Sequence, residues 1–357
     1  MPAFFLPGEI KKTRRPQSAV RSHAMQRYLR FFKPVILAAL LYPSALVFAE
    51  VTLKYATLAP ENTVWAKTIK KCVDEIAEKT HGQVQIKVFY GGIAGDEPSV
   101  MRKLRTGTID IASFTGQTLG SVVPESRLLE LPYFFENTKQ IDAVVAKLYP
   151  ELAKKFLNQG LVLAGWGENG FVYLMSKNKP ITKYADMQGV KIWAPKGDPL
   201  VKAMLAEYGL VPVYLGFEAV LPQLKTGGID AFYAPPYGAI GLQWFREAKF
   251  ITNSRLANAA GGTLLAKSAY DKLTDEQKKI VHTTLEKYAY QLTLELRREN
   301  DKSMQILLNK GVQKVEPNPE ELAGLKATAV KVQDKLVGEL YSRELLQLAR
   351  KARDAAK

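Results

Sequence analysis

The chain has 357 residues, 47% of them hydrophobic, which is enough for two ordinary domains with a sizeable core. Its formal net charge is +15, but residues 1–49 hold eight of the basic residues and one acid, which leaves +8 for the remainder. The lysines of that remainder are interspersed with acids along predicted helices. This pattern is typical of a solvated surface and argues against a nucleic-acid partner.

Residues 1–49 have the composition of a secretory signal peptide. A basic segment precedes Pro34–Ala49, which carries no charge, and small residues at its end predict cleavage after Ala49. The basic segment is long, so we expect translation to start at Met25 and residues 1–24 to be an extension. The alternative is an uncleaved anchor, but the apolar run is shorter than the roughly 20 residues that span a membrane. We therefore predict an exported protein that does not itself span the membrane.

Strands and helices alternate between residues 51 and 115. The strand VTLKYATLA begins at Val51, a helix is expected from about Thr63 to Thr80, and VQIKVFY is a second strand. Another helix and the strand IDIASF follow, an order that predicts a parallel sheet with helices on its faces. Cys72 is the single cysteine and lies on the apolar face of the first helix, so we expect a buried thiol.

The same order recurs between residues 171 and 235, and one turn is repeated. LRTGTIDIA (104–112) has a near copy in LKTGGIDAF (224–232). We interpret each copy as the return from a helix into a strand, once in each of two α/β lobes. Ligands of open α/β sheets bind beyond the carboxyl ends of the strands. The residues after each copy are therefore expected near a cleft between the lobes.

After Lys267 the chain is predicted to be almost wholly helical. Thr274 and Gln277 form a capping box, and Gly311 is the expected stop of a helix that runs from about residue 275 to 310. At 1.5 Å per residue this helix would be on the order of 50 Å long, so it would have to lie across both lobes. Asn318 and Pro319 predict the start of a last helical segment.

The sequence offers little that resembles a catalytic or metal site. GWGENG (165–170) matches a dinucleotide-binding pattern, but a strand follows it where a phosphate-binding helix is needed. Ser176–Lys179 and Lys225–Gly227 match serine-acylase motifs in the wrong structural context. After the signal only two histidines and one cysteine remain, too few for a clustered metal site. We predict neither enzymatic activity nor a cofactor.

The ordered set of motifs resembles the DctP-type solute-binding proteins of tripartite ATP-independent periplasmic (TRAP) transporters. The resemblance rests on HGQVQIKVFYGG, DEPSVMRKLRTGTIDIA, LPYFFEN, NGFVYLMSKNKPI, ADMQGVKIWAP and LPQLKTGGIDAFYAPP, which follow in the family's order and spacing. It implies a two-lobed α/β periplasmic binding protein with a long helix bridging both lobes. The expected boundaries are 50–168 for lobe I, completed by about 258–295, and 169–257 for lobe II, completed by about 296–357. It also implies a periplasmic location and small and large membrane subunits as partners.

Three positions depart from the family pattern. The arginine that binds a substrate carboxylate in the family aligns with Trp193, a second arginine aligns with Val172, and a polar Glu-Asn-Pro aligns with Tyr233–Pro235. A buried carboxylate without such partners would be costly. We therefore expect an apolar, aromatic or weakly polar solute rather than a simple dicarboxylate.

The candidate site residues follow from these departures and from the predicted strand ends. The walls of the site are expected to be Trp193, Phe217, Tyr233 and Tyr237, its rim Trp166 and Trp65, and its hydrogen-bonding residues Thr115 with Glu168 or Asn169. A stand-alone periplasmic carrier or sensor of hydrophobic ligands is the alternative function, and a periplasmic enzyme a more remote one.

Overall fold

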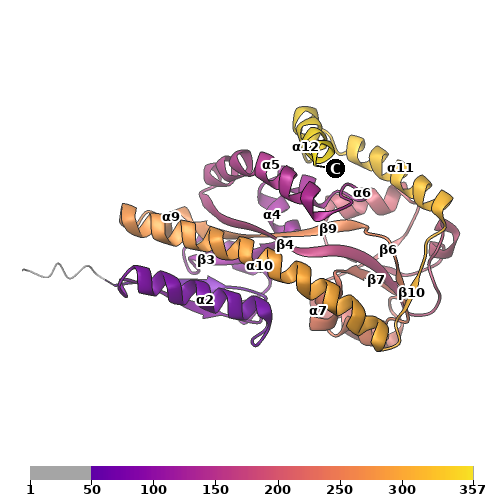
Figure 1. Cartoon of the computed structure of the whole chain (residues 1–357), viewed down its shortest axis with the longest axis horizontal. Coiled ribbons are helices and arrows are strands. Elements are labelled where there is room, and N and C mark those ends of the chain that lie inside the picture. Colours follow the sequence, from indigo (N-terminus) through magenta and orange to yellow (C-terminus); the bar gives the residue numbers. More distant parts are fainter. Residues whose placement is uncertain (1–49, 357) are drawn as a thin grey trace, which may run out of the picture. The chain divides into compact units, whose positions relative to one another are not determined.

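The computed structural model describes residues 50–356, in which helices pack around a ten-stranded sheet (Figure 1). The predicted signal peptide and its alternative start at Met25 lie outside the described residues. Within residues 50–356, no helix is long and apolar enough to cross a membrane.

The first half of the sheet is built from three parallel strands. These are β1 (Val51–Ala56), β2 (Val84–Phe89) and β3 (Ile111–Thr115), in the order β2-β1-β3. The helices α2 (Val64–Lys79) and α3 (Glu97–Arg105) connect them, each capped at its start by the side chain of the preceding residue. The predicted strand–helix alternation of this segment is confirmed.

The second half repeats this arrangement. Its strands are β5 (Ile192–Pro195), β6 (Pro212–Leu215) and β7 (Ala231–Ala234), and β5 pairs in parallel with both of the others. The helices α6 (Pro199–Glu207) and α7 (Phe217–Thr226) connect them. The sequence predicted each of these elements.

Two long antiparallel strands join the halves. The strand β4 (Leu161–Ser176) pairs with β9 (Ala257–Ala266) along almost its whole length, and β9 also pairs with β3 while β4 pairs with β7. The strand β4 runs unbroken through the glycines of GWGENG, after which the sequence predicts a strand, and β9 is a strand that the sequence did not predict. The glycines serve close packing, because a Cβ on Gly165 would lie 2.6 Å from the Cβ of Ala289 on the helix above.

That helix is α10 (Asp275–Asn309), whose 35 residues begin at the predicted capping box of Thr274 and Gln277. It packs on β4, on α2 of the first half and on α8 (Pro236–Gly241) of the second (Figure 1). The prediction of a long helix that lies across both halves is therefore confirmed.

The remaining elements cover the sheet and its edges. The helix α12 (Arg343–Ala355) packs on α5 (Thr138–Asn158) and η1 (Pro124–Glu130), which belong to predicted lobe I, although the sequence assigned α12 to lobe II. The predicted lobe boundaries stay a prediction. The other short elements are α4 (Gly116–Val122), η2 (Tyr184–Met187), η3 (Trp244–Glu247), β8 (Phe250–Thr252), α9 (Lys267–Tyr270), β10 (Gln313–Val315) and α11 (Pro319–Lys335).

The repeated turn has the same structure in both halves. The Asp110 carboxylate accepts a hydrogen bond from the Lys54 N–H at 2.8 Å, and the Asp230 carboxylate accepts one from the Lys191 N–H at 3.2 Å. In each case the aspartate preceding one strand holds the backbone of the neighbouring strand. The repeated aspartate is thus explained by the sheet itself.

Cys72 lies in the core of the first half and is 2% exposed. Burial raises the pKa of its thiol to about 12, so the thiol stays protonated at neutral pH. The predicted buried thiol is confirmed.

Candidate functional site

The two halves of the sheet meet where their parallel strands end. The helix α4 begins directly after β3, and its Gln117 donates a hydrogen bond from Nε2 to the Lys196 carbonyl at 2.8 Å. Lys196 directly follows β5. The carboxyl ends of β3 and β5 are therefore brought together, whereas the sequence prediction concerned the ends of β3 and β7.

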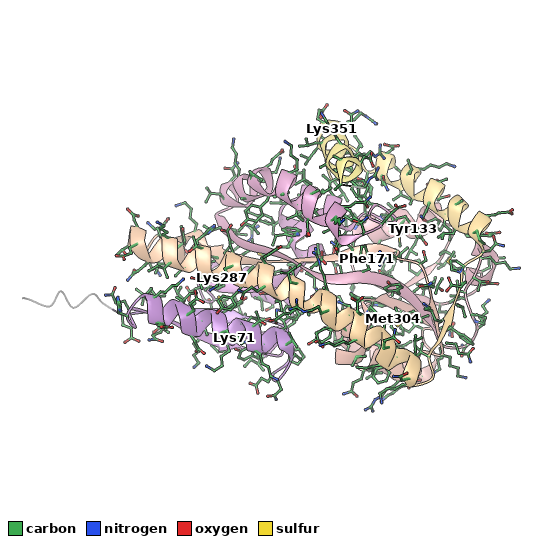
Figure 2. The ribbon with its side chains drawn as sticks, in the orientation of Figure 1. Lys71, Tyr133, Phe171, Lys287, Met304 and Lys351 are labelled. Atoms are coloured by element: carbon green, nitrogen blue, oxygen red, sulfur yellow. The ribbon has the colours of Figure 1, made fainter. Side chains whose placement is uncertain are left out.

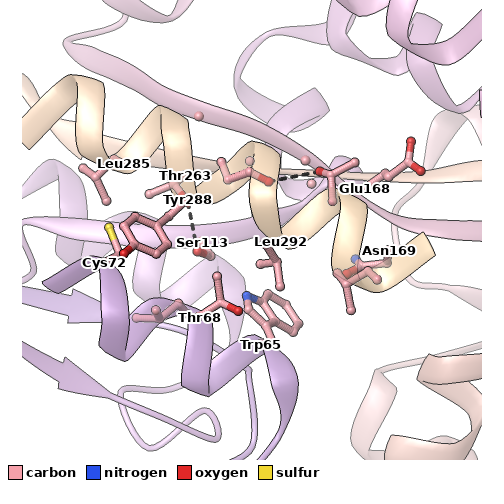
Figure 3. Close-up of a pocket in the computed structure, with 18 of the residues that line it drawn as sticks. Trp65, Thr68, Cys72, Ser113, Glu168, Asn169, Thr263, Leu285, Tyr288 and Leu292 are labelled. Atoms are coloured by element: carbon pink, nitrogen blue, oxygen red, sulfur yellow. Dashed lines mark hydrogen bonds between the residues drawn. The ribbon is translucent and has the colours of Figure 1, made fainter. Parts of the chain in front are cut away.

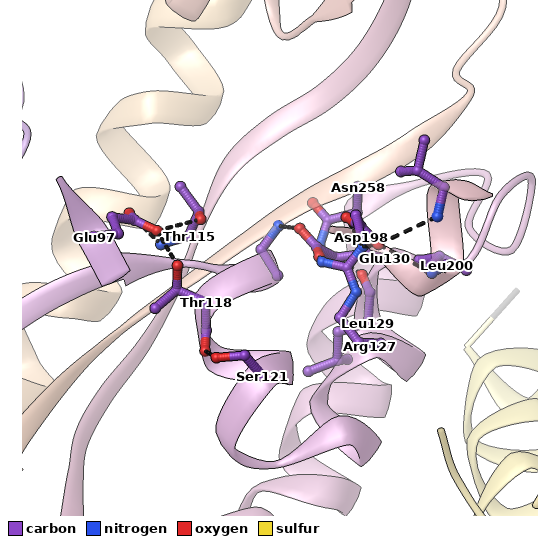
Figure 4. Close-up of polar contacts among 12 residues, drawn as sticks. Glu97, Thr115, Thr118, Ser121, Arg127, Leu129, Glu130, Asp198, Leu200 and Asn258 are labelled. Carbon is purple, nitrogen blue, oxygen red and sulfur yellow. Dashed lines mark hydrogen bonds and ion pairs between the residues drawn. The ribbon is translucent and has the colours of Figure 1, made fainter. Parts of the chain in front are cut away.

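A buried ion cluster lies at this boundary (Figure 4). Nη2 of Arg127, on η1, lies 2.8 and 3.1 Å from the two carboxylate oxygens of Asp198. Arg127 also pairs through Nη1 with Glu130, whose other oxygen accepts from the Ala260 N–H at 2.8 Å. Arg127 is 5% exposed and Asp198 3%. We call Arg127, Glu130 and Asp198 the boundary cluster.

Each member of the boundary cluster is held by the backbone around it. Asp198 is the N-cap of α6, and its Oδ1 accepts from the N–H groups of Leu200 and Val201 at 3.0 and 3.2 Å. Two glycines of α4 make room for the side chains on the other side. A Cβ on Gly116 would lie 2.2 Å from the Glu130 carboxylate, and one on Gly120 would lie 2.4 Å from Cδ of Arg127.

Charge and burial oppose each other in this cluster. Burial lowers the pKa of Arg127, but the carboxylates of Glu130 and Asp198 outweigh it, so the net direction is upward and the guanidinium stays charged. Burial raises the pKa of Glu130 in spite of the neighbouring guanidinium. The hydroxyl of Tyr233 has its pKa raised well above the ordinary value, by burial first and then by the charge of Asp198. Tyr233 on β7 is thus close to the cluster.

Three of the predicted wall residues lie together. The ring of Trp193 lies 5.2 Å from those of Phe217 and Tyr233 and 5.1 Å from that of Trp244, between centroids. Trp193 is 2% exposed, and its indole N–H donates to the Leu215 carbonyl at 3.1 Å. Its ring is thus packed into the core of the second half in this structure. Phe217, by contrast, is 39% exposed.

Three other candidates line a small cavity inside the first half (Figure 3). Trp65, Glu168 and Asn169 face it from α2 and β4, and Leu292 and Tyr288 of α10 close it. Its volume is about 60 Å³, whereas cavities for small organic ligands commonly measure about 300 Å³ or more. The structure therefore places these residues apart from the aromatic group around Trp193.

Glu168 and Asn169 already have partners in α10. Arg297 donates to both oxygens of Glu168 at 2.7 and 3.2 Å and also pairs with Asp142. Burial raises the pKa of Glu168, and the bonds to Arg297 oppose that rise. The Asn169 carbonyl accepts from Nδ2 of Asn300 at 2.7 Å. Both residues thus tie the middle of β4 to the long helix.

Thr115 is engaged by the carboxylate of Glu97, at the start of α3. Its N–H and hydroxyl donate to the two oxygens of Glu97 at 2.8 and 2.7 Å, and the Thr118 hydroxyl donates to the same carboxylate (Figure 4). Burial raises the pKa of Glu97, while these hydrogen bonds oppose the rise. Glu97 thus connects α3 to the end of β3.

The last two candidates lie near the long helix and β9. The N–H of Tyr237 donates to Oδ1 of Asn300 at 3.0 Å. Burial raises the pKa of the Tyr237 hydroxyl, and Val64 and Thr63 at the start of α2 oppose that rise. Tyr237 therefore reaches from the second half toward the first. Trp166 pairs across β4 and β9 with Gly262, and its buried indole N–H has no partner among the described residues.

A more open groove runs beside α10. Its volume is about 530 Å³, and Phe171 and Met304 are among the residues that line it (Figure 2). Arg255 lies 4.6 Å from the Phe171 ring, while Arg297 in the same groove is already paired with Glu168 and Asp142. Of the predicted site residues, only Glu168 borders this groove.

Sequence reasoning missed the boundary cluster. Arg127 lies between Glu125 and Glu130 in a segment that is otherwise rich in leucine, and a charge in such a segment signals a buried partner. Asp198 precedes Pro199, and this pair predicts the start of a helix. Because the N-cap role already explains the aspartate, the sequence gives no sign that it also pairs with Arg127. In the described part of the chain, no group of three or more His, Cys, Asp or Glu could hold a metal ion.

Comparison with known proteins identifies the family. Residues 55–339 match the family of bacterial extracellular solute-binding proteins, family 7, known as DctP. The chain belongs to this family. The family resemblance and the two-lobed α/β fold class predicted from the sequence are confirmed, and the members and neighbours of this family are binding proteins, not enzymes.

Several relatives can be named. The chain is 26% identical over 227 residues to the 2,3-diketo-L-gulonate-binding periplasmic protein YiaO of Escherichia coli, covering 63% of this chain and 69% of that protein. The chain is also 24% identical over 223 residues to a solute-binding protein of Chromohalobacter salexigens. This match covers 62% of this chain and 66% of that protein. The fold is similar to that of a sugar acid binding protein from Advenella mimigardefordensis in complex with galactonate. The TM-score is 0.81 at 18% identity, over 87% of this chain and 100% of that one.

Proposed function

We propose that this protein is the periplasmic solute-binding component of a TRAP-type transporter, which captures a small solute between its two halves and delivers it to membrane subunits. Family membership carries this proposal. The meeting of the ends of β3 and β5, through Gln117 and Lys196, supports the boundary as the place of capture.

The connections between the halves fit a hinge. The strands β4 and β9 and the helix α10 continue through both halves, whereas the Gln117–Lys196 and Arg127–Asp198 contacts join separate segments. A rotation about the continuous elements would break these two contacts and leave the sheet pairing intact. Capture would then consist of solute entry into the open boundary followed by their formation.

The residues at the boundary favour a neutral or weakly polar solute. The resemblance implies polar groups of the family at the positions that hold Trp193, Val172 and Ala234 here, and these residues are 2%, 7% and 6% exposed. The guanidinium of Arg127 is already paired with two carboxylates. A solute carboxylate would therefore meet no free guanidinium at these positions, and its desolvation would not be offset.

The relatives favour the opposite solute class. Solved neighbours are described with galactonate or with D-glucuronate, and the Escherichia coli relative is named for a keto acid. These proteins are at most 26% identical to this chain over the aligned residues. Sugar acids are therefore the first competitors against which a neutral solute must be tested.

The test is identification of the solute that accompanies the native protein. We expect mass spectrometry of extract from protein purified without denaturation to show an uncharged or aromatic compound. Calorimetry should then show that this compound binds more tightly than galactonate or glucuronate. Micromolar binding of either acid to the boundary, with no neutral solute recovered, would refute the proposed class and leave the transport role standing.

Transport is tested separately from solute class. Uptake of the recovered solute into cells that carry the membrane subunits should require this protein. If the protein binds a solute but uptake does not depend on it, the alternative of a stand-alone carrier or sensor replaces the transport proposal.

A further inference from the structure

The boundary cluster contains a carboxylate–arginine contact in which the protein supplies both partners. Arg127 comes from η1 in the first half and Asp198 from the start of α6 in the second, and the two oxygens of Asp198 lie 2.8 and 3.1 Å from one guanidinium nitrogen. Both side chains are almost completely buried. A bond of this kind needs the two halves to be in contact.

We infer that Asp198 stands in for the carboxylate of an acidic solute, so that closure needs no anionic solute and both Nη atoms of Arg127 are occupied by carboxylates of the protein. This inference rests on the proposed function, because it names the feature that selects the solute class. The inference concerns Arg127 and Asp198. It does not concern Trp193, Val172 or Ala234, the positions at which the resemblance implies polar groups.

The geometry fits a fixed internal ligand. Asp198 cannot easily swing away, because its Oδ1 also accepts the N–H groups of Leu200 and Val201. Arg127 lies over Gly120 and pairs with Glu130 within its own half, so it would keep one carboxylate when the halves separate. Closing adds the carboxylate of Asp198, so the guanidinium of Arg127 then lies between two carboxyl groups of the protein. An anion placed beside the closed cluster would have to compete with the Asp198 carboxylate for this guanidinium.

The atoms left over at the boundary suit an uncharged polar group. Nε of Arg127, the hydroxyl of Tyr233 and Oδ1 of Asn258 are buried and have no hydrogen-bond partner among the described residues. Two of these groups can donate a hydrogen bond and two can accept one. A solute hydroxyl or carboxamide can do both without adding charge, whereas a carboxylate can only accept.

The first test measures closure without any solute. Spin labels on Ser121→Cys of α4 and Lys202→Cys of α6 would report the distance between the halves, since both positions are exposed and Cys72 is buried. Asp198→Asn removes the charge and keeps an equally good N-cap. We expect the closed population to fall roughly tenfold, because it removes the charge from a buried ion pair. The matched control, Asp275→Asn, removes an exposed carboxylate at the start of α10 and should leave the distances unchanged.

The second test measures charge selectivity with two probes of nearly the same shape, glucuronate and glucuronamide. We expect the wild type to bind the amide more tightly than the acid. In Asp198→Asn the affinity ratio of acid to amide should rise about tenfold, since the substitution removes the charged competitor for the guanidinium of Arg127. Asp275→Asn should keep the wild-type ratio.

The outcomes separate the two proposals. The inference is overturned if Asp198→Asn keeps the wild-type closed population, or if the wild type binds glucuronate more tightly and the ratio does not change. If neither probe binds, the closure measurement decides alone. Failure of the solute-binding proposal would look different, because then no solute would accompany the native protein and none would change the distance between the halves.

Discussion

The two repeated turns are alike up to the strand and unlike beyond it. In both halves a helix ends, an Ile-Asp pair follows, and the aspartate, Asp110 or Asp230, accepts a backbone N–H of the neighbouring strand. At the end of β3 the chain presents Thr115, held by the Glu97 carboxylate. Near the end of β7 it presents Tyr233, packed against Trp193. The sheet requires the same aspartate in both turns. The strand ends beyond the turns have no such requirement, and one holds a hydrogen-bonded threonine while the other holds a packed tyrosine.

The difference extends to how each strand end is stabilised. The first half uses hydrogen bonds to a buried carboxylate, and the second uses contacts among aromatic rings. The boundary cluster lies near both strand ends. Arg127 and Glu130 are on η1, which follows α4 beyond β3, and their partner Asp198 comes shortly after β5 in the second half. The comparison therefore predicts that substitutions in the second half act mainly on packing, and that those in the first half act mainly through charge and pH.

The largest expected effect is that of Trp193→Ala. Trp193 contacts three aromatic rings and is 2% exposed, so truncation should lower the free energy of unfolding by about 3–5 kcal/mol. The measurement is urea unfolding followed by circular dichroism. Phe217→Ala is the matched control, because Phe217 belongs to the same aromatic group but is 39% exposed and should cost clearly less. Equal costs would show that the aromatic strand end is not a packed core.

The repeated aspartates offer a second, smaller test. Asp110→Ala and Asp230→Ala each leave a strand N–H without its acceptor, which should cost about 1–2 kcal/mol of unfolding free energy. Asp110→Asn and Asp230→Asn keep a side-chain oxygen and should recover most of the loss. The same denaturation experiment serves for all four variants. If only one of the two alanine variants were destabilised, the structural equivalence of the turns would be disproved.

Much of the fold could be predicted because local signals and the global fold agree. The repeated turn, the capping box of Thr274 and the parallel strands were all identified from sequence, and the structure confirms them. The strand β9 was missed because its glycines and alanines have weak strand preference, and pairing with β3 and β4 supplies what the residues lack. The candidate site fared less well. A single sequence shows that Trp193 is aromatic, but not that it is buried.

The boundary cluster could not be predicted, since its pairing is a tertiary event. Arg127 and Asp198 are 71 residues apart, and no local pattern connects them. The glycines at 116 and 120 read as poor helix formers until the Glu130 and Arg127 side chains are seen lying across them. Such pairings depend on how two halves of a sheet meet, which periodicity does not encode.

The smallest expected effect is a change in pH dependence at the end of β3. Burial raises the pKa of Glu97 above its ordinary value of 4.5, so the folded protein binds a proton that the unfolded chain has released. The stability that this proton contributes is therefore present below the ordinary pKa and is lost as the pH rises through the folded value. Glu97→Gln should remove this part of the slope, so the variant should lose less unfolding free energy than the wild type as the pH rises above 4.5.

Thermal unfolding at several pH values would measure how the unfolding free energy depends on pH in the wild type and in Glu97→Gln. The control is Glu218→Gln at the start of α7, the first-turn acid of the corresponding helix in the second half, and it should leave the slope unchanged. Burial also raises the pKa of Glu130 and Glu168, so a slope remains in every variant, and the difference between Glu97→Gln and the wild type is what decides. A wild-type slope in Glu97→Gln would mean that hydrogen bonds from Thr115 and Thr118 keep Glu97 charged. The first strand end would then be an anion site held by hydroxyls, and the contrast with the aromatic end of β7 would be sharper still.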